Sequence, residues 1–437
     1  MRVAPIARAA ALGGAALFFA GGAALAQTSA ASTGKIDPAD TAWMIVATGL
    51  VLMMTIPGLA LFYAGMVRKK NVLATMAQSL AATALCSILW CAFGYTLVFA
   101  GDAPVLGTLS RALLRGISID SISPLAPTIP EALFMLYEMA FAIITTALVA
   151  GSVADRMRFS AFLWFAALWL IVVYVPIAHW VWGGGFLGSA GMLDFAGGTV
   201  VHLNAGAGGL VAALVLGARR GYGNENFAPY DLSLAVIGTG LLWVGWFGFN
   251  GGSAFGANSR AVFAIVSTHL AASAGALTWM ALEWWTRGKP SVLGMISGAV
   301  AGLGTITPAS GYVLPWHGVI IGIAAGAVCF WACTKLKLIL GYDDSLDVFG
   351  VHGVGGATGT LLTGVFAVSA VGKASGLIEG HGAQVGLQLY GIIVTFAWSA
   401  IATFVLLKVI AFFMPLRVDK QSEMEGLDVT QHGEALQ

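Results

Sequence analysis

Two aspartate–histidine pairs with the same spacing are the residues of this sequence best suited to chemistry. Asp194 precedes His202 in the segment DFAGGTVVH, and Asp344 precedes His352 at the same distance in DSLDVFGVH. A glycine-rich stretch follows each histidine. Imidazole can stay neutral near physiological pH while it donates one hydrogen bond and accepts another. The repeated pattern indicates two related chain segments that bring their histidines together.

Each of these side chains also has a purely structural interpretation. A pair of histidines can be satisfied core residues, although the repeat favours a functional pair, and His179, His269 and His317 have no such counterpart. Asp194 could bind a cation directly. Because it stands just before a glycine-rich apolar segment, its carboxylate could instead cap the start of a helix. The structural role is the favoured interpretation for Asp194.

The composition indicates that these residues lie in a membrane protein. The chain has 437 residues, of which 58% are hydrophobic and 9% are charged, whereas ordinary soluble domains have about 25% charged residues. Its 58 glycines favour close packing of helices in lipid. The net charge of +1 and the scattered basic pairs give no patch for nucleic acid. The 4 cysteines lie in apolar runs and are interpreted as small core residues.

Apolar runs long enough to cross a bilayer recur along the whole chain, and they predict an all-α integral membrane protein with about eleven transmembrane helices. The predicted spans are 42–66, 73–100, 132–154, 159–178, 197–217, 232–252, 259–285, 291–307, 317–338, 346–369 and 386–414.

The ends and the charged loops predict the orientation of this bundle. Arg2 and Arg8 precede an apolar stretch and the small residues up to Ala26, which is typical of a signal peptide spanning residues 1–26. Most basic residues between spans follow odd-numbered spans. The positive-inside rule then places the N-terminus outside and the C-terminus in the cytoplasm.

An odd number of spans and the repeated aspartate–histidine pattern favour an internal repeat. We expect a transmembrane domain at 27–414, made of two inverted five-helix repeats and one extra helix. The predicted parts are repeat one at about 42–217, repeat two at about 232–369, helix eleven at about 386–414 and a cytoplasmic regulatory tail at 415–437.

Four longer segments resemble one known family. They are DFAGGTVVHLNAG from Asp194, WFGFNGGS from Trp246, DVFGVHGVGG from Asp347 and EGLDVTQHGE from Glu425. They are similar in type and order to motifs of the ammonium transporter (Amt/Mep/Rh) family, and most similar to its bacterial Amt branch. The resemblance implies a homotrimer with a narrow hydrophobic pore in each subunit, an inner-membrane location, and a PII-type signal protein that binds the tail.

The resemblance also implies a role for individual residues. Phe141, Trp182 and Ser253, with Tyr137 beside them, match the external ammonium site, and Phe141 with Phe249 matches the gate. The pore residues implied are His202, His352, Trp246, Leu148 and Leu242, with Asp194 essential mainly for architecture. At position 138 the family often has a neutral amide, whereas this chain has Glu138.

Together these features predict an ammonium transporter without a cofactor. The expected mechanism is recruitment of ammonium ion at an aromatic site, loss of its proton, and passage of ammonia past the histidine pair, with or without a separately moving proton. The alternative is a membrane ammonium sensor that acts through a PII-type protein. An enzyme is not expected, because the spans contain no H-E-x-x-H or G-x-S-x-G motif.

Overall fold

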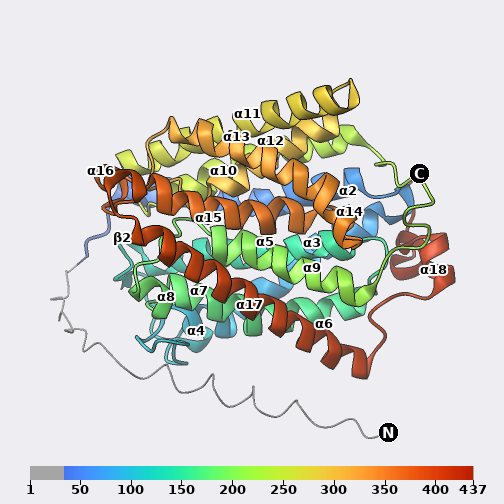
Figure 1. The fold of residues 1–437 in the computed structure, drawn as a ribbon. Helices are drawn as coiled ribbons and strands as arrows, with labels where there is room; N and C mark the ends of the chain where they lie inside the picture. The colour runs from blue at the N-terminus through green and yellow to red at the C-terminus, as the bar shows by residue number, and fades with distance from the viewer. Residues whose placement is uncertain (1–33, 437) are drawn as a thin grey trace, which may run out of the picture.

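The computed structural model describes residues 34–436, and in this range the chain folds into a bundle of helices that lie side by side (Figure 1). The signal peptide predicted at 1–26 lies outside the described residues. Within them, 9 helical segments are long and apolar enough to cross a membrane. These are Pro38–Met66, Lys69–Phe99, Glu131–Val153, Phe159–Ser189, Gly198–Leu216, Leu232–Gly252, Ser259–Arg287, His317–Leu340 and Ala383–Phe413.

Several of these segments are composite, because π-helical or 3-10 turns interrupt their α-helices. The composite ones contain α1 (Pro38–Met53), η1 (Met54–Leu59), α2 (Ala60–Met66), η2 (Lys69–Asn71), α3 (Val72–Leu89), η3 (Trp90–Gly94), α4 (Tyr95–Phe99), α6 (Phe159–Trp169), η5 (Leu170–Tyr174), α7 (Val175–Val181), α8 (Phe186–Ser189), η6 (Gly198–Leu203), α9 (Asn204–Leu216), α13 (His317–Trp331), η7 (Ala332–Leu336) and α14 (Lys337–Leu340). The continuous ones are α5 (Glu131–Val153), α10 (Leu232–Gly252), α11 (Ser259–Arg287) and α17 (Ala383–Phe413).

Two further apolar helices lie in the bundle where the sequence predicts the remaining spans. One is α12 (Val292–Ile306), and the other combines η8 (Phe349–Gly353) with α15 (Val354–Phe366). Both are shorter than the length of about 20 residues that a helix needs to cross a bilayer unaided. The helix ends agree with the predicted ends to within a few residues, except that the fourth segment continues to Ser189.

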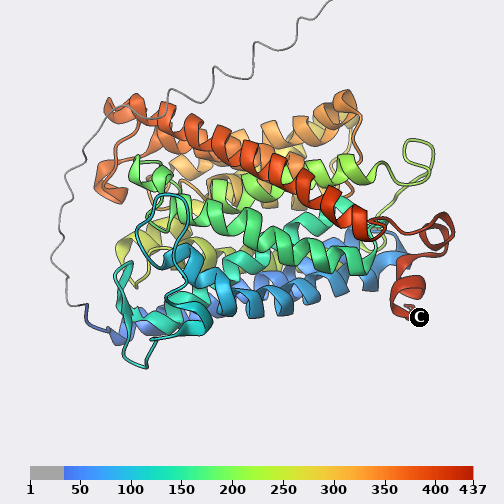
Figure 2. The same cartoon turned by 90° about the horizontal axis from the view of Figure 1, so that it is seen from below.

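The bundle has two structurally different ends (Figures 1 and 2). One, called the hairpin end here, carries the antiparallel strands β1 (Ile122–Ser123) and β2 (Ala126–Pro130), with α8 and α16 (Ser369–Gly372). The connecting segments also contain the short helices η4 (Ala112–Leu114) and η9 (Leu377–Glu379). The opposite end, called the tail end, carries α18 (Lys420–Glu425) and η10 (Asp428–His432).

Ion pairs are concentrated at the tail end. Asp155 is 3.0 Å from Arg68 and 3.5 Å from Arg219, and Arg219 pairs with Asp343 at 2.7 Å. Burial by itself would raise the pKa of Asp343, but the hydrogen bonds and charge of Arg219 outweigh it and lower that pKa below its usual range. This network joins the connections that follow four different helical segments.

The C-terminal tail is ordered and packs against the start of α3. The Asn71 side chain accepts a hydrogen bond from the N–H of Leu427 at 2.8 Å, and Asp428 accepts one from the N–H of Ala74 at 2.8 Å. Arg417 pairs with Glu423 at 2.8 Å within the tail. The polar composition of this segment by itself is typical of a flexible terminus, whereas the family resemblance implies an ordered tail. The contacts of the tail agree with the resemblance.

Candidate functional site

The two histidines predicted to meet do meet, inside the bundle. Their Nδ1 atoms are 3.2 Å apart, and the rings are stacked at 14° with centroids 5.2 Å apart. His202 lies on η6 and His352 on η8, so both occupy π-helical turns, which often mark functional sites. One Nδ1 must donate and the other accept. The pair therefore offers one Nε2 that donates and one that accepts.

Glycine allows the two histidine-bearing helices to come this close. A Cβ on Gly206 would lie 2.2 Å from the backbone of Gly353, the residue after His352. No side chain fits at that separation. The crossing of α9 and η8 therefore sets the distance between the imidazoles, because each ring is one turn or less from the contact.

A small apolar cavity surrounds the histidine pair. It has a volume of about 10 Å³ and is lined by Leu59, Phe62, Ile144, Leu148, Val201, His202, Leu242, Trp246, Phe249, Val300 and His352. The Trp246 ring stacks on His202 at 20° with centroids 5.4 Å apart, and its N–H donates to Thr307 at 2.9 Å. All three apolar pore residues taken from the resemblance, Trp246, Leu148 and Leu242, line this cavity.

Two phenylalanines form the wall between this cavity and a larger one towards the hairpin end. The rings of Phe141 and Phe249 pack at 33° with centroids 4.2 Å apart. Phe141 lines the larger cavity and Phe249 lines the small one. A solute moving between the two cavities must therefore pass this ring pair, which is the arrangement expected of a gate.

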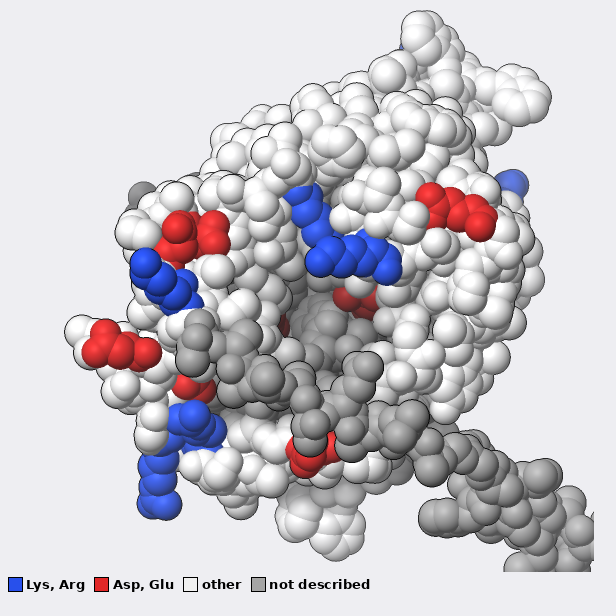
Figure 3. Space-filling view, turned by 90° about the vertical axis from the view of Figure 1, so that its left-hand side faces the viewer, with Lys and Arg blue, Asp and Glu red and all other residues white. Residues whose placement is uncertain are grey.

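The larger cavity, called the vestibule here, has a volume of about 230 Å³ and opens at the hairpin end. Figure 3 views that end and shows a hollow with acidic atoms in its walls. The vestibule is lined by Phe99, Leu125, Phe134, Glu138, Phe141, Val181, Trp182, Phe195, Ser253 and Phe255. Trp182 stands edge-on to Phe141 at 88°, with centroids 5.9 Å apart.

Ser253 contributes a hydroxyl to the wall of the vestibule, and the buried Tyr137 contacts this hydroxyl. The Ser253 hydroxyl donates to the carbonyl of Phe249 at 2.9 Å, so its oxygen can still accept. The Tyr137 hydroxyl lies 3.2 Å from that of Ser253 and 2.7 Å from the Phe249 carbonyl. Tyr137 is fully buried and does not line the vestibule, so it contacts the site residues rather than the space between them.

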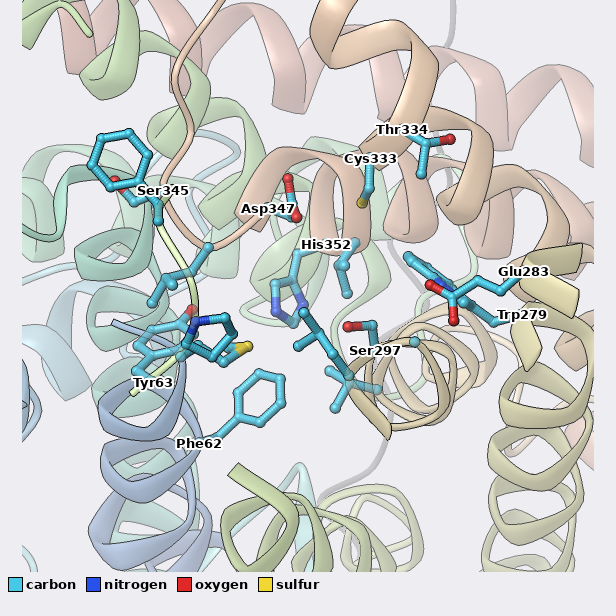
Figure 4. Close-up of a pocket in the computed structure, with 18 of the residues that line it drawn as sticks. Phe62, Tyr63, Trp279, Glu283, Ser297, Cys333, Thr334, Ser345, Asp347 and His352 are labelled. Atoms are coloured by element: carbon cyan, nitrogen blue, oxygen red, sulfur yellow. The ribbon is translucent and has the colours of Figure 1, made fainter. Parts of the chain in front are cut away.

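A third cavity opens towards the tail end. It has a volume of about 250 Å³, and the labelled residues of Figure 4 show His352 at its centre, with Phe62 and Tyr63 nearby. Its wall also carries Glu283 and Asp347. His352, with Phe62 and Val300, lines both this cavity and the small one, so it stands at the boundary between them. The described chain thus contains a vestibule, a phenylalanine pair, a histidine cavity and a further cavity towards the tail end, in that order.

Comparison with known protein families shows which proteins this chain is similar to. The model described as Ammonium Transporter Family matches residues 42–436. The chain belongs to the ammonium transporter family. It is 48% identical over 397 residues to an ammonium transporter of Bacillus subtilis (strain 168), covering 90% of this chain and 97% of that protein.

Solved structures of the ammonium transporter family agree with the fold. The crystal structure of Saccharomyces cerevisiae Mep2 matches with a TM-score of 0.82 and 40% identity, covering 89% of each chain. A structure titled Sensor Amt Protein matches with a TM-score of 0.83 but 27% identity, covering 90% of this chain and 98% of that one. Family membership and the apolar helices together make this a multi-pass membrane protein.

In this member of the family, Asp194 holds the helix of His202 in place. Its Oδ1 accepts from the N–H groups of Gly197 and Gly198, at 2.8 and 2.7 Å. Its Oδ2 accepts from the N–H and hydroxyl of Thr199 and from the N–H of Val200. A left-handed Gly197, with φ of 113°, lets these donors converge. The main-chain oxygen of Asp194 also accepts from the Trp182 ring at 2.9 Å.

These contacts bear on the two interpretations of Asp194. Both carboxylate oxygens are already occupied by donors, and Asp194 does not line the vestibule. The geometry therefore supports the structural role, in which one residue positions both the vestibule tryptophan and the pore histidine.

Several residues that line the vestibule were not predicted from the sequence. Phe134 stands seven positions before Phe141 on α5, so helical spacing could have placed it on the same face. Phe99, Phe195 and Phe255 come from three other segments, and only the folded chain brings them to the vestibule.

Proposed function

We propose that this protein transports ammonium across the membrane, with the vestibule as the site that recruits the ion and the histidine cavity as the path for ammonia. The observation that supports this most directly is the order of the cavities. A vestibule with aromatic faces and a hydroxyl lies on one side of a phenylalanine pair, and an apolar cavity with two histidines lies on the other.

Recruitment uses the aromatic faces and Ser253. A small cation is attracted to the faces of Trp182 and Phe141, each worth roughly 0.5–2 kcal/mol. The Ser253 oxygen accepts an N–H bond that an alkali ion cannot donate. Tyr137 acts on this site by fixing Ser253 and the main chain at Phe249, because its hydroxyl bonds to the Ser253 hydroxyl and to the Phe249 carbonyl.

Past the gate, the interior favours a neutral solute. Moving an ion of this size from water into a low-dielectric medium costs on the order of 20 kcal/mol before relaxation. The small cavity supplies only apolar side chains and the two imidazoles against that cost. Ammonium therefore transfers its proton to water on the vestibule side of the gate, and ammonia passes the histidines as a donor to one Nε2 and an acceptor from the other. Whether the proton follows by its own route is what the experiment below decides.

The wider assembly follows from the same proposal. We infer that α12 and the η8–α15 helix complete eleven spans, arranged as two inverted repeats and one extra helix. The hairpin end faces outside and the tail end faces the cytoplasm of the inner membrane. A homotrimer with one pore per subunit, and a PII-type protein that binds the ordered tail, are the partners we propose.

The ammonium sensor is the second candidate, and the observation in its favour is the likeness to the Sensor Amt Protein structure. That likeness is at 27% identity, against 48% for the Bacillus subtilis transporter. The succession of cavities on both sides of the phenylalanine pair also supports a protein that moves its ligand.

The test is an ammonium jump applied to purified protein in liposomes, with current and internal pH recorded together. We expect a saturable current in the wild type that His202→Leu/His352→Leu abolishes, while His269→Leu leaves it unchanged. His269 is an exposed histidine of α11 that packs beside Trp243 and Phe247, away from the cavities.

Each other outcome has a defined meaning. Internal alkalinisation without current would show neutral ammonia transport, so the proton would stay behind. Wild-type current that survives in the double leucine variant would show that the proton route avoids the histidines. Neither signal in the wild type would overturn the transport proposal in favour of the sensor.

A further inference from the structure

One acidic side chain faces the vestibule and has no part in the proposal above. Phe134, Glu138 and Phe141 are spaced at i, i+4 and i+7 on α5, which puts them on one face of the helix. All three line the vestibule. Glu138 therefore stands one turn from the gate phenylalanine, on the outer side of the gate.

The Glu138 carboxylate is buried and unpartnered. The residue is 5% exposed, and among the described residues its Oε2 is buried with no hydrogen-bond partner. Two turns earlier on the same helix, the Oε2 of Glu131 also has no hydrogen bond among the described residues, but the Oε1 of Glu131 accepts from the Tyr95 hydroxyl at 2.9 Å and its Oε2 lies 3.7 Å from Arg111. The contrast is informative, because a buried carboxylate is ordinarily paired or hydrogen-bonded.

The groups around Glu138 do not compensate for its charge. Apart from Leu125, Val181 and Ser253, the residues that line the vestibule with it are aromatic, and the hydroxyl of Tyr137 is already shared between Ser253 and main-chain carbonyls. The nearby phenols of Tyr95 and Tyr174 and the carboxylates of Glu131 and Asp194 add no positive charge. The one open direction for the carboxylate is the vestibule itself.

We propose that Glu138 is an anionic recruiting group that turns the aromatic vestibule into a site for a monovalent cation with N–H donors. This inference rests on the proposed function and adds a specificity-determining residue to it. A bound ammonium ion supplies the missing partner, since it gives Glu138 both a positive charge and a hydrogen bond. Ammonia and other neutral solutes gain far less from the carboxylate, so the vestibule selects the charged form.

The position of Glu138 predicts which kinetic quantity it controls. Because the carboxylate lies outside the Phe141–Phe249 pair, it acts on binding of the ion and not on passage through the histidine cavity. The half-saturating ammonium concentration should therefore depend on its charge, whereas the maximal current should not. Electrostatic recruitment should also weaken as salt screens the charge.

The experiment compares four full-length proteins in liposomes on a solid-supported membrane. They are the wild type, Glu138→Gln, Glu138→Asp and the control Glu379→Gln. Glutamine keeps the shape and removes the charge, whereas aspartate keeps the charge on a shorter stem. Glu379 is an exposed carboxylate on the α16–α17 connection at the same end, so its substitution changes the overall charge equally.

We expect Glu138→Gln to raise the half-saturating ammonium concentration about tenfold, equivalent to about 1.4 kcal/mol, at unchanged maximal current. Glu138→Asp should give a smaller rise, and Glu379→Gln none. Added choline chloride should weaken wild-type affinity more than that of Glu138→Gln.

Three results would overturn the inference. One is an unchanged half-saturating concentration in Glu138→Gln. Another is a loss of maximal current in a Glu138→Gln protein that elutes and melts like the wild type, which would place the carboxylate in passage and not in recruitment. The third is an equal salt effect in both proteins. A wild type with neither current nor alkalinisation would instead refute the transport proposal on which this inference rests.

Discussion

The two aspartate–histidine segments have the same spacing, but different hydrogen bonds hold each of them in place. Asp194 saturates both carboxylate oxygens with donors from the turn that leads to His202. Asp344 accepts one hydrogen bond, from the N–H of Phe349 at 2.7 Å, and its Oδ1 is buried with no partner among the described residues. In the half that contains Asp194, the carboxylate is therefore fully occupied by local donors.

The half that contains Asp344 relies on a lysine from the preceding helix. The Lys337 ammonium donates to the main-chain oxygen of Asp344 at 2.6 Å and to the carboxylate of Asp347 at 2.8 Å. A repeat seen in the sequence thus predicts where two side chains lie, but not which contacts keep them there. The predictions below test this difference.

The largest expected effect is that of Asp194→Asn. The new amide group must face either Gly197 and Gly198 or Thr199 and Val200, which leaves at least two buried donors without an acceptor. We expect a loss of more than about 3 kcal/mol of stability and of nearly all current. Thermal unfolding of the purified protein measures the first, and the ammonium jump measures the second. An Asp194→Asn protein that melts like the wild type would contradict the capping role.

Gly206→Ala should have an intermediate effect, because it acts where the two halves touch. Its Cβ would press on the backbone of Gly353 and force the histidine helices apart, at about 1–3 kcal/mol. We expect a reduced melting temperature and a current reduced at least tenfold. The matched control is Gly240→Ala on α10, where a Cβ meets no atom within 4 Å. Equal behaviour of the two alanine variants would show that the crossing does not set the imidazole distance.

The smallest expected effect is that of Asp344→Asn, the same substitution as the first prediction at the related position. Asparagine keeps an acceptor for the Phe349 N–H, and Lys337 holds a main-chain oxygen that the substitution does not touch. We expect a loss below about 1 kcal/mol and a current close to that of the wild type. A loss equal to that of Asp194→Asn would mean that the two halves are held in the same way after all.

Most of the fold was predictable because hydrophobicity in lipid is a strong constraint. Each predicted span coincides with a helix, since a helix in a bilayer must satisfy its own backbone. The meeting of His202 with His352 was predictable from the repeated spacing. The count of long apolar helices was less so, since α12 has only 15 residues and the η8–α15 helix is rich in glycine and threonine.

The details of the site were harder to predict for a physical reason. Phe195 and Phe255 reach the vestibule from connections whose path depends on tertiary contacts and not on periodicity. The full set of donors to Asp194 depends on the left-handed Gly197, and a sequence does not state which glycine takes that conformation. The environment of Glu138 was beyond prediction because burial and the lack of a partner are properties of the folded chain.

The contacts of the packed tail also determine when this end of the molecule can finish folding. Asn71 donates to Asp155 and accepts from Leu427, which lies 356 residues later in the chain. The Lys70 ammonium likewise donates to the carbonyls of Glu423 and Met424. This end of the molecule is therefore incomplete until the chain has been synthesised through Leu427. A chain that stops before Glu423 would leave Asn71 and Lys70 without these partners.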